Sequence, residues 1–239
     1  MGPYSGFIET GSPSSPNVNA ETFVSDDFVD KTPSLFGSWS TTTYNAAYLA
    51  ENWSTVGSTT KYGSSIGIVG YAQIANLVVA MLNNNPSSVQ PAGATVDGVN
   101  VSGTSQATLE VALSEAIYFL TNGKTTTSGG VTTYYIGSTK LGTSTGGVST
   151  TLAISLINAV KGLIGNSTQA ASALESRTDS QVWVFVPGSG TNPEFWGLFP
   201  TAVPEGGVLL AYLLVGVTTT KQHTVRYYYR RPTTYCKPF

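Results

Sequence analysis

Charged residues are scarce in this chain of 239 residues. They make up 10% of the sequence, against roughly 25% in an average soluble domain. Ser, Thr, Gly, Asn and Tyr are abundant in their place. A surface of hydroxyl and amide groups carries little charge for pH to alter, and it differs from the mixed-charge surface that keeps an ordinary enzyme in solution. The composition therefore favours a protein exposed to a harsh exterior, or one whose surface is covered by copies of itself.

Cysteine and histidine each occur once. The single cysteine, Cys236, excludes an intrachain disulfide and a cysteine-based metal cluster, and we expect it to be a core or surface thiol. The single histidine, His223, has no partner at metal-ligand spacing. The acidic residues Asp26, Asp27 and Asp30 do not follow the pattern of a calcium loop. The sequence predicts no metal site and no cofactor.

The sequence also lacks the patterns of an export signal and of a membrane span. Residues 1–16 are polar and rich in Gly, Pro and Ser, without a charged segment followed by an apolar one. The longest apolar stretches, 66–82 and 208–217, are interrupted or short. Three Asn-X-Ser/Thr matches are glycan acceptors only in an exported chain: Asn52, Asn100 and Asn166. An exterior-type composition without an export signal fits a protein that is released from the cell within a particle.

The apolar periodicity predicts helices in the middle of the chain and strands towards its end. Five segments are expected to be helical: 44–53, 65–82, 104–122, 150–164 and 167–176. Strands are expected in four segments: 131–136, 182–186, 208–217 and 225–231. The first of these lies within a surface hairpin region. A small hairpin should turn at Asp97-Gly98, and 192–204 predicts an aromatic, proline-rich loop.

This order predicts an α+β fold, with several amphipathic helices followed by an antiparallel sheet that ends in a C-terminal hairpin of 208–217 and 225–231. The alternative is an all-β sandwich or jelly roll with inserted helices. Along the chain, we expect an extended N-terminal arm at 1–40, a single α+β core domain at 41–231 and a C-terminal tail at 232–239.

Aromatic residues in the arm and the tail indicate that both segments bury themselves against something. A purely disordered arm would be poor in aromatics, while its prolines and glycines break any helix. We expect the arm to lie on its own domain or on another copy, and the tail to reach a neighbour. The subunit-interface residues predicted in this way are Tyr4, Phe7, Phe23, Phe28, Phe36, Trp39, Tyr235 and Phe239.

The segment 225–231 has one basic, aromatic face if it alternates as a strand. Its residues are Arg226, Tyr228 and Arg230, continued by Arg231. Arginine contacts phosphate and tyrosine stacks on bases, so the face could bind nucleic acid. The same residue types are enriched at protein interfaces. Because no polybasic arm accompanies the face, we prefer the interface interpretation.

One pentapeptide, Gly103-Thr104-Ser105-Gln106-Ala107, resembles the nucleophile motif of subtilisin-like serine proteases. It departs from that motif after the serine and lacks the proline that follows. The only histidine comes after Ser105, whereas that family places its aspartate and histidine before the serine. Helix capping accounts for Thr104 and Ser105. Cys236 and His223 could act as nucleophile and base, but one lies on a terminal tail and the other on an expected strand, which does not favour a shaped catalytic site. We therefore expect no enzymatic activity.

These observations together predict a non-enzymatic, self-assembling structural protein of the virion, a coat or capsid subunit whose arm and tail contact neighbouring copies. Its partners would be copies of itself, other coat proteins and, through the basic face, nucleic acid. The alternative is an extracellular or cell-surface module, similar in role to an adhesin, that binds glycans through exposed aromatics such as Trp183 and Trp196. A hydrolase with an unrecognised site is the third hypothesis.

Overall fold

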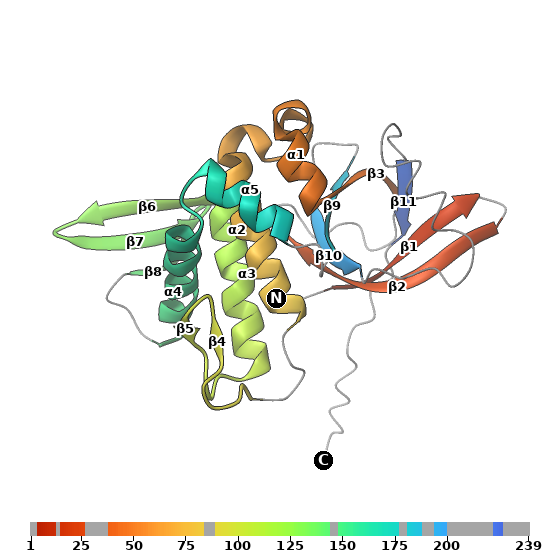
Figure 1. Cartoon of the computed structure of the whole chain (residues 1–239). Coiled ribbons are helices and arrows are strands. Elements are labelled where there is room, and N and C mark those ends of the chain that lie inside the picture. The colour runs from red at the N-terminus through yellow and green to blue at the C-terminus, as the bar shows by residue number, and fades with distance from the viewer. Residues whose placement is uncertain are drawn as a thin grey trace, which may run out of the picture.

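A computed structural model of the chain describes residues 4–12, 15–26, 38–83, 89–143, 148–176, 181–187, 194–199 and 222–226. It contains a closed antiparallel barrel, a layer of helices and two small antiparallel sheets. The helices lie between the barrel and the larger of the two small sheets (Figure 1). The α+β class predicted from the sequence is confirmed.

The barrel is built from strands near both ends of the chain. They are β1 (Tyr4–Ser12), β2 (Ser15–Ser25), β3 (Ser38–Asn45), β9 (Gln181–Pro187), β10 (Phe195–Phe199) and β11 (Gln222–Arg226). They pair in the order β1-β11-β3-β9-β10-β2. Val182, Val184 and Phe185 of β9 are all buried, so this strand is covered on both of its faces. Closure of the barrel leaves it without a free edge.

The helical layer consists of α1 (Ala46–Val56), the short 3₁₀ helix η1 (Gly57–Thr59), α2 (Gly63–Leu82), α3 (Gln106–Asn122), α4 (Val148–Leu163) and α5 (Ser167–Glu175). The core lies between α2, α3 and α4. On α3, Leu109, Leu113 and Ile117 recur every four residues and are fully buried. The Ser105 hydroxyl accepts a hydrogen bond of 3.2 Å from the backbone N–H of Thr108, which confirms that Ser105 caps this helix.

Helix α2 lies at the centre of the layer and packs against α3 and α5. Among the described residues it is the one helix that could cross a membrane by length and composition. Ten of its residues are buried in the fold, and its Gln73 amide donates to the carbonyl of Ile164 over 2.6 Å. The absence of a membrane span stays a prediction.

The two small sheets occupy the chain between α2 and α4. The hairpin of β4 (Thr95–Val96) and β5 (Val99–Asn100) turns at Asp97 and Gly98, whose φ angles are 51° and 80°. The larger sheet contains β6 (Gly123–Ser128), β7 (Val131–Ile136) and β8 (Thr139–Thr143), in that order. Gly129 and Gly130, with φ of 56° and 77°, turn β6 into β7, as a two-residue hairpin requires.

The structure differs from the sequence-based expectation in where the sheet comes from. The predicted loop at 192–204 contains β10, so that prediction was wrong there. Strands β1 and β2 lie within the expected arm and pair with β11 and β10 of the same chain. Their partners are far away in sequence, and barrel closure is a tertiary event that local patterns do not encode. Strand β11 pairs with β1 on one side and with β3 on the other, so Val225 and Arg226 have no free side for the predicted hairpin partner 208–217, and the hairpin prediction was wrong there. Segments 208–217 and 227–231 lie outside the described residues.

Candidate functional site

Two carboxylic acids are buried where the barrel meets the helices. Asp26 directly follows β2 and Glu194 directly precedes β10, and both side chains are 0% exposed. The antiparallel register places Ser25 opposite Phe195, so the two acids meet at the end of the strand pair. The Glu194 N–H donates to Asp26 Oδ1 over 3.1 Å, and the Asp26 N–H donates to the Glu194 carbonyl over 3.3 Å.

Each carboxylate receives hydrogen bonds from further elements. Tyr71 of α2 donates its hydroxyl proton to Glu194 Oε2 over 2.5 Å, and the Lys61 backbone N–H donates to Glu194 Oε1 over 2.6 Å. Trp196 of β10 donates its indole N–H to Asp26 Oδ2 over 3.1 Å. We call Asp26, Tyr71, Glu194 and Trp196 the acid cluster. It joins the barrel to the helical layer.

The electrostatics of the acid cluster favour protonated groups. Burial raises the pKa of Asp26, and the negative charge of Glu194 raises it further. Burial also raises the pKa of Glu194. It raises the pKa of the Tyr71 hydroxyl as well, and the negative charges of Glu194 and Asp26 raise that pKa further. The charge of Lys61 acts in the opposite direction on both acids. The pair therefore keeps a proton at pH values where an ordinary carboxyl has lost it.

Paired carboxyls with shifted pKa values also occur in acid–base catalysis. A catalytic pair must be accessible to its substrate, because a carboxyl that transfers a proton has to come within hydrogen-bond distance of the reacting group. All four members of the acid cluster are buried, with 0% exposure each. In the described part of the chain, the arrangement connects the barrel to the helical layer through hydrogen bonds.

We predict that Trp196→Phe lowers the free energy of unfolding by about 1–3 kcal/mol, because Asp26 loses a donor inside the protein. Urea unfolding followed by circular dichroism measures the change. The matched variant Trp53→Phe alters a ring that also packs on Tyr71, at 5.1 Å between centroids, but that is only partly buried. Equal losses in the two variants would show that the indole N–H contributes little.

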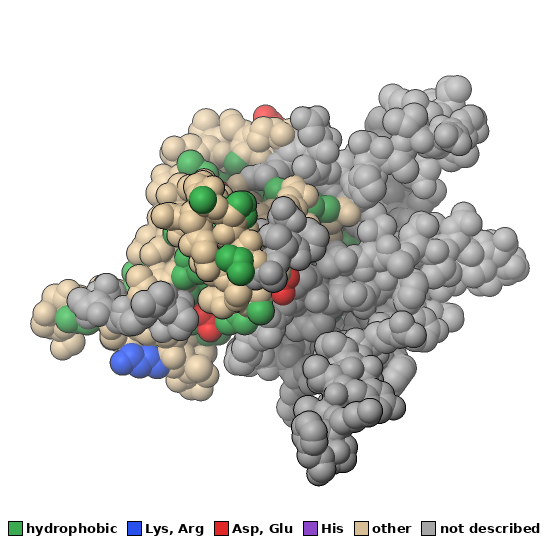
Figure 2. All heavy atoms as spheres, turned by 90° about the horizontal axis from the view of Figure 1, so that it is seen from below, with side chains coloured by type: hydrophobic (Ala, Val, Ile, Leu, Met, Phe, Trp, Pro, Cys, Tyr) green, Lys and Arg blue, Asp and Glu red, His purple; other side chains and the backbone are tan. Residues whose placement is uncertain are grey.

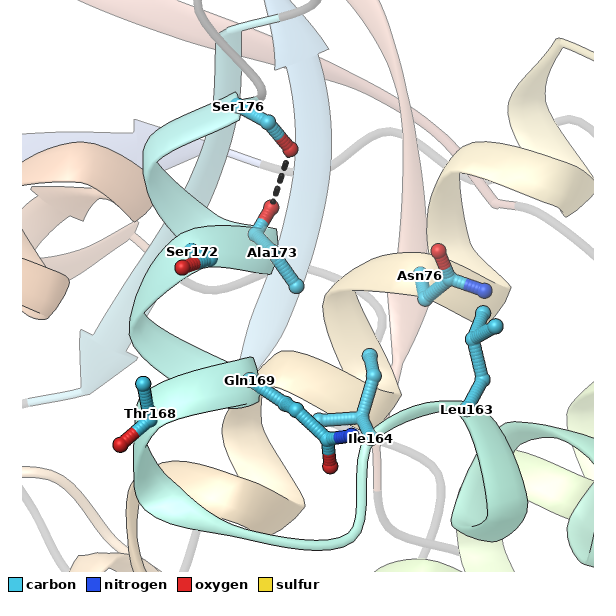
Figure 3. A pocket seen from close by; sticks show the side chains of 8 residues that line it. All are labelled: Asn76, Leu163, Ile164, Thr168, Gln169, Ser172, Ala173 and Ser176. Carbon is cyan, nitrogen blue, oxygen red and sulfur yellow. Dashed lines mark hydrogen bonds between the residues drawn. The ribbon is translucent and has the colours of Figure 1, made fainter.

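A depression of ≈ 410 Å³ lies beside α5 and the end of α4. Figure 3 shows its side chains: Asn76, Leu163, Ile164, Thr168, Gln169, Ser172, Ala173 and Ser176. The Ser176 hydroxyl donates to the Ala173 carbonyl over 3.1 Å. The lining contains amides, hydroxyls and aliphatic groups but no ionisable side chain. It offers hydrogen bonds to a ligand, and it supplies no acid or base for catalysis.

The sheet of β6, β7 and β8 projects from the helical layer on the side away from the barrel (Figure 1). Tyr134 and Ile136 anchor its root and are buried. The Tyr134 ring packs against Phe119 of α3 at 5.4 Å between centroids, and its hydroxyl donates to Asn158 Oδ1 of α4 over 3.3 Å. Beyond this root, the whole of β6 from Lys124 to Ser128 is exposed. The sheet is thus held firmly at one end and open to solvent at the other.

The two outer strands of this sheet differ. All six residues of β6 pair with β7 in an unbroken register, whereas the pairing of β7 with β8 shifts between Tyr134 and Tyr135. Folded proteins commonly protect sheet edges with charges, prolines or bulges. The β8 edge has such an irregularity and carries Lys140. From Thr125 to Ser128, β6 has neither a charge nor a proline, and within the described part of the chain it pairs only with β7.

The structure places some of the predicted interface residues in register with each other. Tyr4 of β1 lies opposite Phe23 of β2, and Phe7 lies opposite Arg226 of β11. Trp39 of β3 lies opposite Val225. The remaining predicted residues lie outside the described part: Phe28, Phe36, Tyr228, Arg230, Arg231, Tyr235 and Phe239. Their interface role stays a prediction.

The other candidate residues do not form a catalytic set in the part of the chain that the structure describes. His223 lies in β11, opposite Thr41 of β3, and Ser105 caps α3. Trp196 is 0% exposed, so it cannot stack on a glycan, and that part of the adhesin hypothesis was wrong. No group of three or more His, Cys, Asp or Glu among these residues could hold a metal ion.

Sequence reasoning missed the acid cluster. Asp26 and Glu194 are 168 residues apart, and neither stands in a recognisable local motif. The one signal available was a carboxylate beside a β-type segment, which is common at strand ends. Only the pairing of β2 with β10 brings the two acids together.

Comparison of the chain with protein-family models, with curated proteins and with solved structures found no match. The functional argument therefore depends on the residues of the chain itself.

Proposed function

We propose that this chain is a non-enzymatic structural protein that assembles with copies of itself, as a coat subunit of a virion. The observation that carries the proposal is the projecting sheet with its exposed β6 edge. The edge is uncharged from Thr125 to Ser128, and three of these four residues are β-branched threonines; an exposed edge of this kind promotes association between chains. A monomer would gain from protecting it, whereas an assembling subunit can use it.

The composition of the surface supports the same function. Figure 2 shows few charged side chains on the face of the described part that it displays, which consists mainly of uncharged polar and apolar groups. Low charge reduces the repulsion between identical subunits that are packed together. The assignment to a virion rests on this exterior-type composition, and on the aromatic residues at both ends of the chain. Contact of the basic face, from Arg226 to Arg231, with a packaged nucleic acid belongs to the same proposal.

Light scattering of the purified chain tests the proposal. We expect particles whose mass is many times the 25.0 kDa of one chain. Absorbance at 260 nm, recorded alongside, detects nucleic acid that purifies with the particles, and Arg226→Ala should lower that signal. A chain that remains a monomer over a wide range of concentration and pH contradicts self-assembly. In that case glycan binding becomes the function to test.

A further inference from the structure

We infer that β6 joins two copies of the chain, by pairing antiparallel with β6 of the second copy about a two-fold axis. The inference rests on the proposed self-assembly and names the surface that it uses. The two projecting sheets would then form one continuous sheet across the interface. Pairing of exposed edge strands is a recurrent mode of association between proteins.

Hydrogen bonding gives the first argument. In an antiparallel pair, alternate residues direct their backbone N–H and C=O groups to the partner strand. The other residues of β6 direct these groups away from β7, towards solvent. The strand is regularly paired, because all six residues keep one register with β7. It therefore presents a preformed row of donors and acceptors, held in place by the buried root at Tyr134.

The distribution of charge gives the second argument and fixes the orientation. The exposed part of β6 runs from Lys124 to Ser128 and is centred on Thr126. Parallel pairing in register would place Lys124 opposite Lys124 of the second copy, which is destabilising. Antiparallel pairing centred on Thr126 places each Lys124 opposite Ser128 instead, at opposite ends of the contact. The strand is then complementary to itself.

The side chains also suit this arrangement. Thr126 would lie opposite Thr126, and Thr125 opposite Thr127. Cross-strand threonine pairs stabilise neighbouring strands. The sheet already contains one such pair, since the Thr127 and Thr132 hydroxyl oxygens are 3.2 Å apart.

The other strands of the described chain fit this role less well. The barrel is closed and has no edge, and β4 and β5 contain two residues each. The β8 edge has the register shift and Lys140. A second copy is the occupant that the β6 edge favours, because antiparallel pairing of the two strands keeps the Lys124 side chains apart and places no two charged residues opposite one another.

Substitutions on the two edges of the sheet test the inference. Thr126→Lys places two lysines directly opposite each other across the two-fold axis, and we expect the assembled fraction to fall at least about tenfold at fixed concentration. Thr126→Val keeps a neutral β-branched residue, and Thr139→Lys puts the same charge on the exposed β8 edge. Both controls should assemble like the wild type in light scattering. Circular dichroism checks that every variant is folded.

Disulfide trapping tests the geometry without weakening the interface. In a Cys236→Ser background, Thr126→Cys should form an interchain disulfide on mild oxidation, because the two residues face each other within bonding distance. Thr139→Cys in the same background should not. If the particles form, Thr126→Lys assembles normally and no Thr126→Cys dimer appears, β6 is not the interface although self-assembly stands. If the wild type is a monomer, the proposed function itself fails.

Discussion

Replacement of Glu194 by glutamine is expected to flatten the dependence of stability on pH between about pH 4 and pH 7. In the wild type, Asp26 and Glu194 are both buried, and burial raises the pKa of each carboxyl. The glutamine keeps the size of the side chain and an oxygen that can accept from the Lys61 N–H. It removes one titrating group and one negative charge from the pair.

The direction of the effect follows from proton linkage. A carboxyl whose pKa is higher in the folded state binds its proton more tightly there than in the unfolded chain. Its contribution to stability is therefore full below the unfolded pKa, about 4, and is lost as pH rises through the folded pKa. The wild type should thus become less stable from pH 4 to pH 7. The charge of Lys61, which lowers both pKa values, only reduces this loss.

Urea unfolding at several pH values measures the difference. We expect the wild type to lose more stability than Glu194→Gln over this range, because only the wild type carries the Glu194 carboxyl whose pKa burial raises. Half-buried Glu115, whose pKa is also raised by burial, contributes equally to both proteins and cancels. The control Glu175→Gln changes an exposed residue of α5 and should keep the wild-type profile. A Glu194→Gln profile parallel to that of the wild type would show that the pair does not retain its proton.

Leu113→Ala in α3 is expected to lower the free energy of unfolding by about 2–5 kcal/mol. Leu113 is 0% exposed and lies in the core formed by α2, α3 and α4. The substitution removes apolar contacts and leaves a cavity that its neighbours fill only in part. With a total stability of about 5–15 kcal/mol, this is a large part of what holds a domain together.

The chain contains a matched control for this substitution. Leu163, at the end of α4, is 55% exposed, so Leu163→Ala makes the same chemical change without opening a cavity. Its effect should stay within about 0.5 kcal/mol. Thermal and urea unfolding of both variants gives the comparison. A loss at Leu163 as large as that at Leu113 would mean that the exposed end of α4 is covered, for instance by a neighbouring copy.

The barrel also changes how the N-terminal segment should be studied. Deletion of residues 2–35 would remove β1 and β2, which pair with β11, with β10 and with each other. Such a deletion would open the barrel, so its failure to assemble would not identify an interface. Single substitutions on exposed elements, such as those on β6, separate assembly from folding more cleanly.

The sequence by itself determined the local elements. The apolar spacing of Leu109, Leu113 and Ile117 defines α3, Ser105 begins it, and Asp97-Gly98 turns the small hairpin. Each of these depends on interactions between residues a few positions apart, which a local pattern records. The same reasoning correctly placed the surface hairpin around 131–136, and with it the sheet on which the proposed function depends.

Only the tertiary structure decided how the two ends of the chain combine. Strand β10 has apolar residues on either side of Gly197 and is flanked by prolines, so its local sequence predicts a loop. It is a strand because it pairs with β2 and β9. The same pairing brings Asp26 to Glu194, where both are buried, and so creates the acid cluster. Strand pairing and burial depend on long-range contacts between segments that share no local signal. That is the physical reason why the helices could be predicted from the sequence, whereas the barrel and the acid cluster could not.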